Sequence, residues 1–209
     1  MGDFVDHVCS IVDISNLGDL KVVADTANGM GGLILPPVFS KLPFGLEILF
    51  PELDGNFPNH PADPLREENQ KYLRERVLAT KADIGLAFDG DADRVIFSDE
   101  NGDIIHGDQI IALLAKEMKI NNELNNDKVV GTLMSNLGLE NFLKDLKINF
   151  YRTKVGDRYI LDEMIKSNSK LGGEPSGHIL LTDYAKTGDG LLTAIKVLSL
   201  LKKSGMKAS

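Results

Sequence analysis

The stretch ADIGLAFDGDADRVIF, residues 82–97, holds two apolar segments on either side of a short acidic loop. Both segments are typical of buried β-strands. In the loop, Asp89, Asp91 and Asp93 stand at alternate positions, so an uninterrupted strand would present all three carboxylates on one face. The sequence therefore predicts a strand, an acidic loop and a returning strand.

The three aspartates predict a site for a hard divalent cation. Like charges this close repel one another, so such an arrangement usually needs a cation among them. Gly90 and Ala92 are small enough for the backbone to curl around an ion. Carboxylate oxygens in a compact loop suit Mg²⁺ or Ca²⁺ rather than zinc or copper. We therefore expect Asp89, Asp91 and Asp93 to be metal ligands.

Arg94 follows the third aspartate directly. Its guanidinium keeps its charge, and its fork of donors matches a phosphate or a carboxylate. A bound cation beside a fixed guanidinium is suited to a phosphorylated ligand. Arg94 is therefore a candidate catalytic residue that would hold a phosphate.

Two alternatives for the acidic loop remain open at this stage. It could be a solvated acidic turn, although the apolar segments on both sides argue against an exposed position. It could also be a calcium loop of the EF-hand type, with Asp89 as first ligand and Glu100 at the twelfth position. That motif needs glycine where Arg94 stands, and it needs helices where strands are expected.

Composition limits the class of protein. The chain has 209 residues, of which 43% are hydrophobic and 26% charged, enough for one large or two small domains. The net charge of -8 argues against a nucleic-acid partner, which would favour a basic face. A phosphorylated small molecule is still compatible, because a local cation can attract it.

Cysteine usage and hydropathy bear on location. The single Cys9 allows no internal disulfide and is typical of a reducing compartment, so we expect a cytoplasmic protein. No run is long and apolar enough to span a bilayer, and the first residues lack the features of a signal peptide. The sequence does not indicate an oligomeric state.

Strand-like and helix-like segments alternate along the whole chain. The expected strands are 20–24, 46–49, 82–88, 95–97, 128–134, 148–152 and 179–181. The expected helices are 4–14, 65–79, 109–120, 135–146, one ending at 166, and 190–201. This alternation predicts an α/β chain with at least partly parallel sheets, in two units that meet near residues 104–108.

Local signals predict where several helices begin. Pro36 and Pro37 should interrupt a helix over 33–41, so this helix is expected to begin near them. Asp108 and Ser135 are expected to be the N-caps of the helices that follow them.

A proline-rich loop is expected over residues 54–64, between a strand and a helix. It contains His60, which we expect to pack within the loop or to lie at the surface rather than to act in catalysis.

A second polar constellation lies in residues 172–178. Glu174, Ser176 and His178 stand at alternate positions, and in an extended backbone their side chains would point the same way. A carboxylate, a hydroxyl and an imidazole on one face could bind the hydroxyl groups of a sugar. The alternative is a polar surface turn.

Lys154 and Arg158 flank the start of an expected helix. Two cations at a helix N-terminus could bind a phosphate, so both are candidate substrate-binding residues. The alternative is a pair of solvated charges.

Three motifs together resemble the α-D-phosphohexomutase superfamily: residues 89–94, 172–178 and 187–191. The resemblance extends over essentially the whole chain. Members of that family have four domains, and this chain is similar to the second and third. The resemblance implies two consecutive α/β/α domains with mixed sheets, a metal-loop domain over 1–105 and a sugar-loop domain over 106–209.

The resemblance also implies an activity. In that family, an isomerase of the intramolecular phosphotransferase type, a phosphoserine gives its phosphoryl group to a hexose phosphate and receives the other phosphate back. Carried over to this chain, Mg²⁺ would bind at Asp89, Asp91 and Asp93. The sugar loop would use Glu174, Ser176 and His178.

Two motifs of the family have no counterpart here. The Ser-His-Asn-Pro loop of domain 1 carries the phosphoserine, and the Arg-Xaa-Ser-Gly-Thr loop of domain 4 grips the substrate phosphate. The resemblance therefore implies an enzyme fragment that needs domains 1 and 4 and is inactive alone. The rival class is a non-catalytic module that binds metal and sugar phosphate.

The two halves resemble different members of the family. Residues 53–61 look like bacterial phosphomannomutases, whereas 133–138, 155–159 and 172–178 look like phosphoglucosamine mutases. Because the sugar contacts lie in the second group, glucosamine phosphate is the expected substrate, with phosphomannomutase or phosphoglucomutase activity as the alternative. A recombinant join near 97–103 would explain the mixture.

Overall fold

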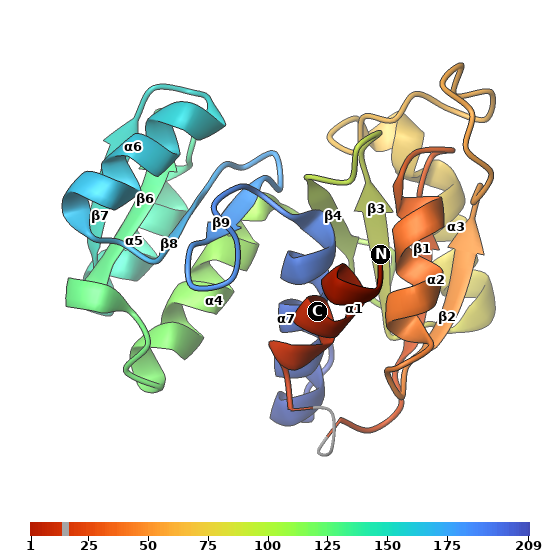
Figure 1. Cartoon of the computed structure of the whole chain (residues 1–209), viewed down its shortest axis with the longest axis horizontal. Helices are drawn as coiled ribbons and strands as arrows, with labels where there is room; N and C mark the ends of the chain where they lie inside the picture. The colour runs from red at the N-terminus through yellow and green to blue at the C-terminus, as the bar shows by residue number, and fades with distance from the viewer. Residues whose placement is uncertain (14–16) are drawn as a thin grey trace. The chain divides into compact units, whose positions relative to one another are not determined.

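The computed structural model describes residues 1–13 and 17–209, which form two compact units. The first unit comprises Met1–Ile105 together with Gly190–Ser209, and the second comprises His106–Asp189 (Figure 1). The fold is that expected from the sequence, with two α/β/α units that each contain a mixed sheet.

The sheet of the first unit has five strands in the order β2-β1-β3-β4-β5. β1 lies parallel to β2 and β3, whereas β3–β4 and β4–β5 are antiparallel pairs. The bounds are β1 Lys21–Asp25, β2 Gly45–Leu49, β3 Ile84–Phe88, β4 Val95–Ser98 and β5 Ile104–Ile105. The parallel strands place the ends of β1, β2 and β3 at one edge, where the acidic loop begins.

Helices cover both faces of this sheet. The bounds are α1 Gly2–Ser10, α2 Gly31–Phe39, the 3-10 helix η2 Glu67–Gln70, α3 Lys71–Thr80 and α7 Gly190–Ser204. On one face, Leu73 and Val77 of α3 pack on Val23 and Ala87. The helix expected over 4–14 forms as far as Ser10, and Ile14 lies outside the described residues.

The last helix, α7, is grouped by its contacts with the first unit. The sugar-loop domain predicted over 106–209 includes this helix, and that division stays a prediction. Its buried residues include Leu191, Ala194, Ile195 and Leu198, the spacing of one apolar helix face. This face packs on β4 and α1 of the first unit.

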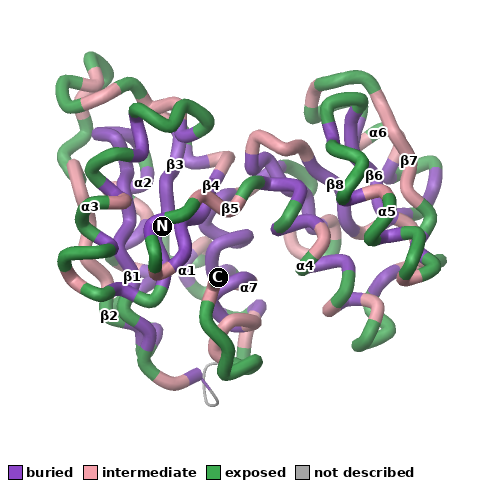
Figure 2. Tube along the Cα trace, turned by 180° about the vertical axis from the view of Figure 1, so that it is seen from behind, coloured by how far each residue is buried: buried purple, intermediate pink, exposed green. Residues whose placement is uncertain are grey.

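The second unit has a four-stranded sheet in the order β7-β6-β8-β9. Only the β8–β9 pair is antiparallel. The bounds are α4 Gly107–Ile120, η3 Asn125–Asp127, β6 Lys128–Thr132, α5 Leu137–Asp145, β7 Asn149–Thr153, α6 Asp157–Ser167, β8 Leu171–Gly173 and β9 Ile179–Leu181. Ile160 and Met164 of α6 pack on Val130 and Leu180 of the sheet. In both units the buried residues follow the strands and the helix sides that face them (Figure 2).

Three predictions about helix starts were wrong. α2 begins at Gly31 and contains both Pro36 and Pro37, because burial of Leu35, Val38 and Phe39 holds the helix across the missing N–H groups. The N-cap of α4 is His106, whose backbone N–H donates to Gln109 Oε1 at 2.9 Å.

The predicted caps Asp108 and Ser135 have other roles. Asp108 is buried inside α4, and its Oδ2 accepts a hydrogen bond from the backbone N–H of Asn136 at 2.7 Å. Burial raises the pKa of the Asp108 carboxyl. Asn136, not Ser135, caps α5, because its Oδ1 accepts from Leu139 N–H at 2.8 Å.

Among the described residues, no helix is both long enough and apolar enough to cross a membrane.

Candidate functional site

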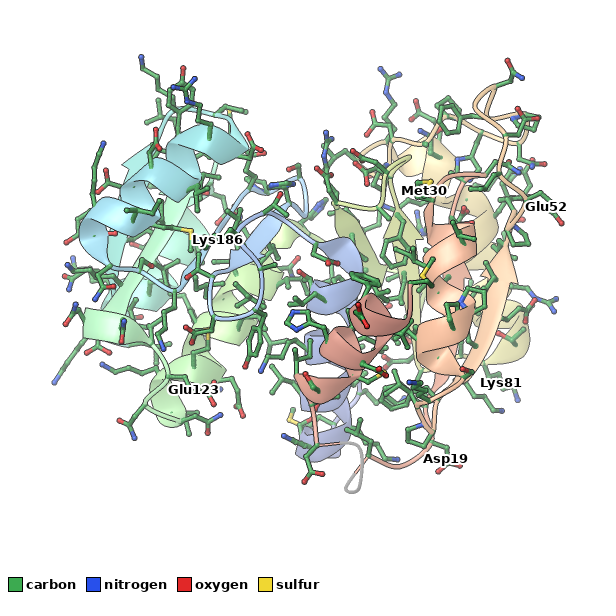
Figure 3. The ribbon with its side chains drawn as sticks, viewed as in Figure 1. Asp19, Met30, Glu52, Lys81, Glu123 and Lys186 are labelled. Carbon is green, nitrogen blue, oxygen red and sulfur yellow. The ribbon has the colours of Figure 1, made fainter. Side chains whose placement is uncertain are left out.

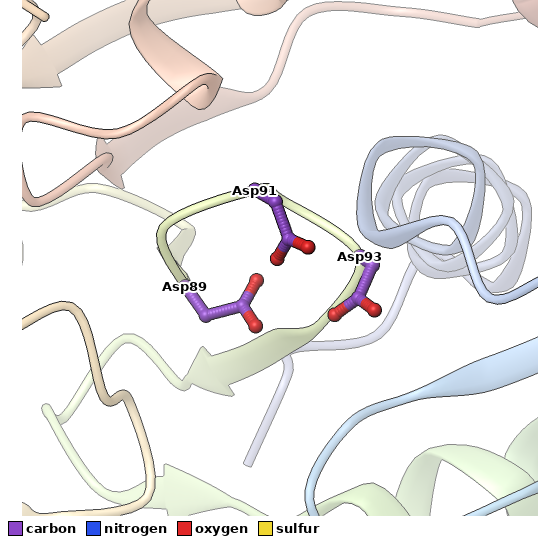
Figure 4. A group of neighbouring side chains, drawn as sticks. All are labelled: Asp89, Asp91 and Asp93. Atoms are coloured by element: carbon purple, nitrogen blue, oxygen red, sulfur yellow. The ribbon is translucent and has the colours of Figure 1, made fainter. Parts of the chain in front are cut away.

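The loop between β3 and β4 brings the three aspartates together. One carboxylate oxygen from each of Asp89, Asp91 and Asp93 lies within 4.8 Å of the other two. The three side chains point into the curve of the loop (Figure 4). They do so because the backbone turns tightly, with Ala92 N–H donating to Asp89 O and Ala92 at φ 61°. The loop gathers the carboxylates by curling, not by extending a strand.

The three carboxylates have unequal surroundings. Asp89 is buried, Asp91 is exposed and Asp93 is half-buried. Burial raises the pKa of Asp89 to about 7, and the charges of Asp93 and Asp91 add to the effect. The Arg94 backbone N–H, 3.1 Å from Asp89 Oδ1, opposes it. A buried carboxylate that resists ionisation would gain from a cation beside it.

Arg94 is already paired with the acidic loop. Its Nε lies 3.3 Å from Asp89 Oδ2 and 3.6 Å from Asp93 Oδ1. The side chain remains 42% exposed, so it can still reach a ligand. The buried Asp89 argues against a solvated turn, and the flanking strands argue against an EF-hand.

Backbone contacts support the acidic loop from two sides. Met30 at the start of α2, labelled in Figure 3, donates its N–H to Gly90 O at 2.9 Å. Gly190 at the start of α7 donates its N–H to Ala92 O at 3.0 Å. A Cβ on Gly190 would lie 2.8 Å from the carbonyl oxygens of Ala92 and Arg94. The sequence offered no sign of these supports except the glycines themselves.

The second constellation is a tight turn, so the extended comb predicted from its spacing is wrong. β8 and β9 pair antiparallel, with Gly173 opposite Ile179, and the residues between them must reverse direction. Glu174 N–H donates to His178 O at 3.0 Å, and Gly177 N–H donates to Glu174 O at 3.1 Å. Alternate positions therefore do not share one face here.

Glu174 and Ser176 nevertheless lie together. Glu174 Oε2 accepts from Ser176 Oγ at 3.2 Å, and Oε1 accepts from the backbone N–H of Gly156 at 2.9 Å. His178 is only 4% exposed. A Cβ on Gly188 would lie 2.3 Å from the His178 ring, so the ring packs directly on that backbone.

Lys154 and Arg158 are both exposed, on either side of Gly156. Lys154 Nζ lies 5.8 Å from the centre of the Tyr159 ring, a cation–π contact. Arg158 is the second residue of α6, and its backbone N–H donates to Asp157 Oδ1. Because Gly156 contacts Glu174, this segment adjoins the β8–β9 turn. Phosphate binding by the two cations remains a prediction.

Comparison with protein families identifies both halves of the chain. Residues 2–102 match the model described as phosphoglucomutase/phosphomannomutase, alpha/beta/alpha domain II, and residues 106–209 match domain III of the same family. The chain belongs to the phosphoglucomutase/phosphomannomutase family. It therefore carries the second and third of the family's α/β/α domains.

Curated and solved relatives agree with this family. Phosphoglucosamine mutase from Staphylococcus aureus (strain JH9) is 45% identical over 206 residues, which are 99% of this chain and 45% of that protein. A phosphoglucomutase/phosphomannomutase family protein from Burkholderia thailandensis has a TM-score of 0.89 at 30% identity, over 97% of this chain and 43% of that one. This chain thus spans less than half the length of both relatives.

A more distant structure shares the fold. Aspergillus fumigatus N-acetylphosphoglucosamine mutase, solved in complex with GlcNAc-6P and magnesium, has a TM-score of 0.71 at 18% identity. The match covers 97% of this chain and 50% of that one.

Proposed function

We propose that this chain supplies the metal-binding and sugar-binding domains of a phosphoglucosamine mutase. The observation that carries the proposal is the convergence of Asp89, Asp91 and Asp93 in a chain that is 45% identical to such an enzyme. The whole enzyme would interconvert the 1- and 6-phosphates of a hexosamine through a phosphoserine outside this chain. The rival substrates are those of phosphomannomutase or phosphoglucomutase.

The acidic loop fits Mg²⁺. Its donors are hard carboxylate oxygens close enough to share one ion, and the buried Asp89 resists ionisation without a counter-charge. Asp89, Asp91 and Asp93 would hold the metal. When bound, Mg²⁺ would neutralise charge on the transferring phosphoryl group.

The other predicted residues would bind and orient the substrate. Arg94 would turn from Asp89 and Asp93 toward the phosphate, which its fork matches. Glu174, held by Gly156, and Ser176 would bind sugar hydroxyls, and His178 would complete the sugar loop. Lys154 and Arg158 would add positive charge for a phosphate. Such positioning is a large part of catalysis in phosphoryl transfer.

The first test is a coupled assay of the chain alone with glucosamine 6-phosphate, primed with the sugar bisphosphate. We expect no turnover, because no serine here lies in the nucleophile motif of the family. Turnover within about a thousandfold of an ordinary rate of roughly ten per second would contradict the fragment interpretation.

The second test adds domains 1 and 4 of a phosphoglucosamine mutase in trans. Restored turnover that is lost with Asp91→Ala would support the proposal, and running mannose 6-phosphate in parallel would choose between the substrates. Mg²⁺ binding without any restored turnover would favour the non-catalytic module. The cytoplasmic location stays a prediction from the single cysteine.

A further inference from the structure

The loop over residues 54–64, here called the wall loop, lies against the acidic loop. A Cβ on Gly90 would lie 3.3 Å from the Phe57 ring and 3.7 Å from Ala62 Cβ. Asp54 N–H donates to Asn28 O, and Asn59 Nδ2 donates to Asn28 Oδ1 at 2.8 Å. The wall loop therefore packs against the acidic loop at Gly90.

The segments around this contact have a strained backbone. Ala27, Asn28, Phe50 and Phe57 have φ values of 46°, 61°, 55° and 50°, in the left-handed region that disfavours residues with a side chain. Such conformations persist only where the surrounding structure holds them. Contacts with the rest of the first unit must therefore stabilise the conformation of the wall loop.

Asp25 and His60 form a buried contact between β1 and the wall loop. His60 Nε2 lies 3.1 Å from Asp25 Oδ1 and 3.0 Å from Oδ2, and Nδ1 lies 2.9 Å from Pro61 O. The Asp25 side chain is 2% exposed and the His60 side chain 10%. Both ring nitrogens face oxygen atoms, an arrangement that fits a ring carrying hydrogen on both nitrogens. The geometry is that of an imidazolium bound to a carboxylate.

The neighbours of the ring are compatible with that charge. The Phe50 ring meets it edge-on with centroids 5.5 Å apart, and the Tyr72 ring stacks on it at 6.2 Å. In the described part of the chain, the titratable residues in contact with the ring are Asp25 of β1 and Tyr72 of α3. The hydrogen bond to Asp25 raises the pKa of His60 above its ordinary value, against the effect of burial.

The ion pair connects the wall loop to the sheet beside the acidic loop. Asp25 ends β1 and pairs with Ala87 of β3, two residues before Asp89. His60 stands between Phe57 and Ala62, the two residues that contact Gly90. We infer that Asp25 and His60 are positioning residues, an ion pair that clamps the wall loop against Gly90 and so fixes the shape of the acidic loop. The functional consequence rests on the proposed function, because it assumes that this loop binds Mg²⁺.

The first experiment observes the clamp without any metal. In ¹⁵N NMR spectra of the whole chain at about pH 7, where an ordinary histidine is mostly neutral, both ring nitrogens of His60 should carry hydrogen. Asp25→Asn should return His60 to a neutral tautomer. A neutral His60 in the unsubstituted chain at about pH 7 would overturn the inference.

The second experiment measures positioning. His60→Gln should shift the backbone amide signals of Gly90 and Ala92 and speed hydrogen exchange in residues 54–64. The matched control His7→Gln, an exposed histidine in α1 of the same unit, should do neither. Unchanged Gly90 and Ala92 signals in a folded His60→Gln chain would overturn the inference. If that variant does not fold, Asp25→Asn replaces it in the same comparison.

The third experiment links the clamp to the metal. By calorimetry, His60→Gln should weaken Mg²⁺ binding about tenfold, the size of effect seen when a group behind a metal ligand is removed. The His7→Gln control should bind as the unsubstituted chain does. Equal Mg²⁺ affinity of His60→Gln and the unsubstituted chain would overturn positioning. If the unsubstituted chain binds no Mg²⁺, the proposed function fails, while the NMR comparison still decides on the clamp.

Discussion

The acidic loop over residues 89–94 and the turn over residues 172–178 are both polar connections between antiparallel strands. They differ in how far neighbouring groups balance the charge of their carboxylates. In the acidic loop, Arg94 pairs with Asp89 and Asp93, and burial raises the pKa of Asp89 to about 7. In the turn, both oxygens of Glu174 accept hydrogen bonds, from Gly156 N–H and Ser176 Oγ.

This difference separates two ways of building a binding site. In the turn, hydrogen bonds within the chain satisfy the Glu174 carboxylate before any ligand binds. The acidic loop holds negative charge that its own residues only partly balance, which costs stability until a cation binds. These different surroundings fit the sugar-binding role proposed for the turn and the metal-binding role proposed for the acidic loop.

The largest expected effect concerns the ion itself. Asp91→Ala should weaken Mg²⁺ binding by more than about a hundredfold, because a direct ligand matters more than the groups behind it. Calorimetry on the chain measures this affinity. Asp103→Ala, which removes an exposed carboxylate elsewhere in the first unit, serves as the control and should bind normally. Similar losses in both variants would mean that general charge, not the acidic loop, attracts the ion.

The next largest effect is the loss of stability when a Cβ is added at a glycine that packs against each loop. Gly190→Ala places a Cβ against carbonyl oxygens of the acidic loop, whereas Gly188→Ala meets the His178 ring, a side chain. Backbone cannot move aside as easily, so Gly190→Ala should lower the free energy of unfolding by about 1–3 kcal/mol, the usual cost of overpacking. Gly188→Ala should cost less. Denaturant unfolding of both variants gives the comparison, and the reverse order would contradict it.

Matched amide substitutions should have opposite signs in the two loops. Without metal at about pH 8, Asp89→Asn should raise the free energy of unfolding by about 1 kcal/mol, because it removes a buried charge next to two others. Glu174→Gln should lower it by about 1 kcal/mol, because it weakens two hydrogen bonds to a charged acceptor. Thermal or denaturant unfolding checks both signs. A loss of stability in Asp89→Asn would mean that the acidic loop is already balanced.

The size of the stability gain from Asp89→Asn should also depend on pH. The pKa of the Asp89 carboxyl is higher in the folded chain than in the unfolded chain. Between about pH 4 and pH 7 the unfolded chain therefore loses this proton while the folded chain keeps it, so folding becomes less favourable as pH rises. The gain from Asp89→Asn should therefore be small at about pH 4 and complete above about pH 7. Unfolding curves across this range measure it, and a gain independent of pH would point to a packing effect instead.

The smallest expected effect is the loss of stability when the Asp25–His60 ion pair, which lies outside the acidic loop, is removed. The hydrogen bond to Asp25 raises the pKa of His60, so its contribution to stability is complete below the ordinary value near 6.5 and is lost as pH rises through the folded value. His60→Gln should therefore cost about 1 kcal/mol at about pH 6 and less at about pH 9. Unfolding of both chains at the two pH values tests this. A cost that grows with pH would exclude the imidazolium.

Local signals in the sequence predicted the acidic loop well. Asp89, Asp91 and Asp93 lie within five consecutive residues between two strongly apolar strands, so their proximity needed little from the rest of the fold. The position of Glu174 and Ser176 was harder to predict. Their turn exists because β9 returns antiparallel to β8, a pairing that alternate spacing alone cannot reveal.

Errors elsewhere also came from long-range contacts. Asp108 has the residue type of an N-cap, yet it accepts the N–H of Asn136 from another helix. Pro36 and Pro37 lie inside α2 because burial of its apolar face outweighs their local preference. His60 was expected only to pack, because nothing in the sequence indicated Asp25 as its partner, 35 residues away.

The placement of α7 has a consequence for the order in which the protein takes shape. A ribosome delivers residues in sequence, so all of residues 106–189 emerge before α7 does, although α7 completes the first unit. Until Gly190 emerges, Ala92 O lacks the N–H that it accepts in the finished fold. During synthesis the second unit can therefore be finished first, and the acidic loop reaches its final form only when residues 190–209 have been made.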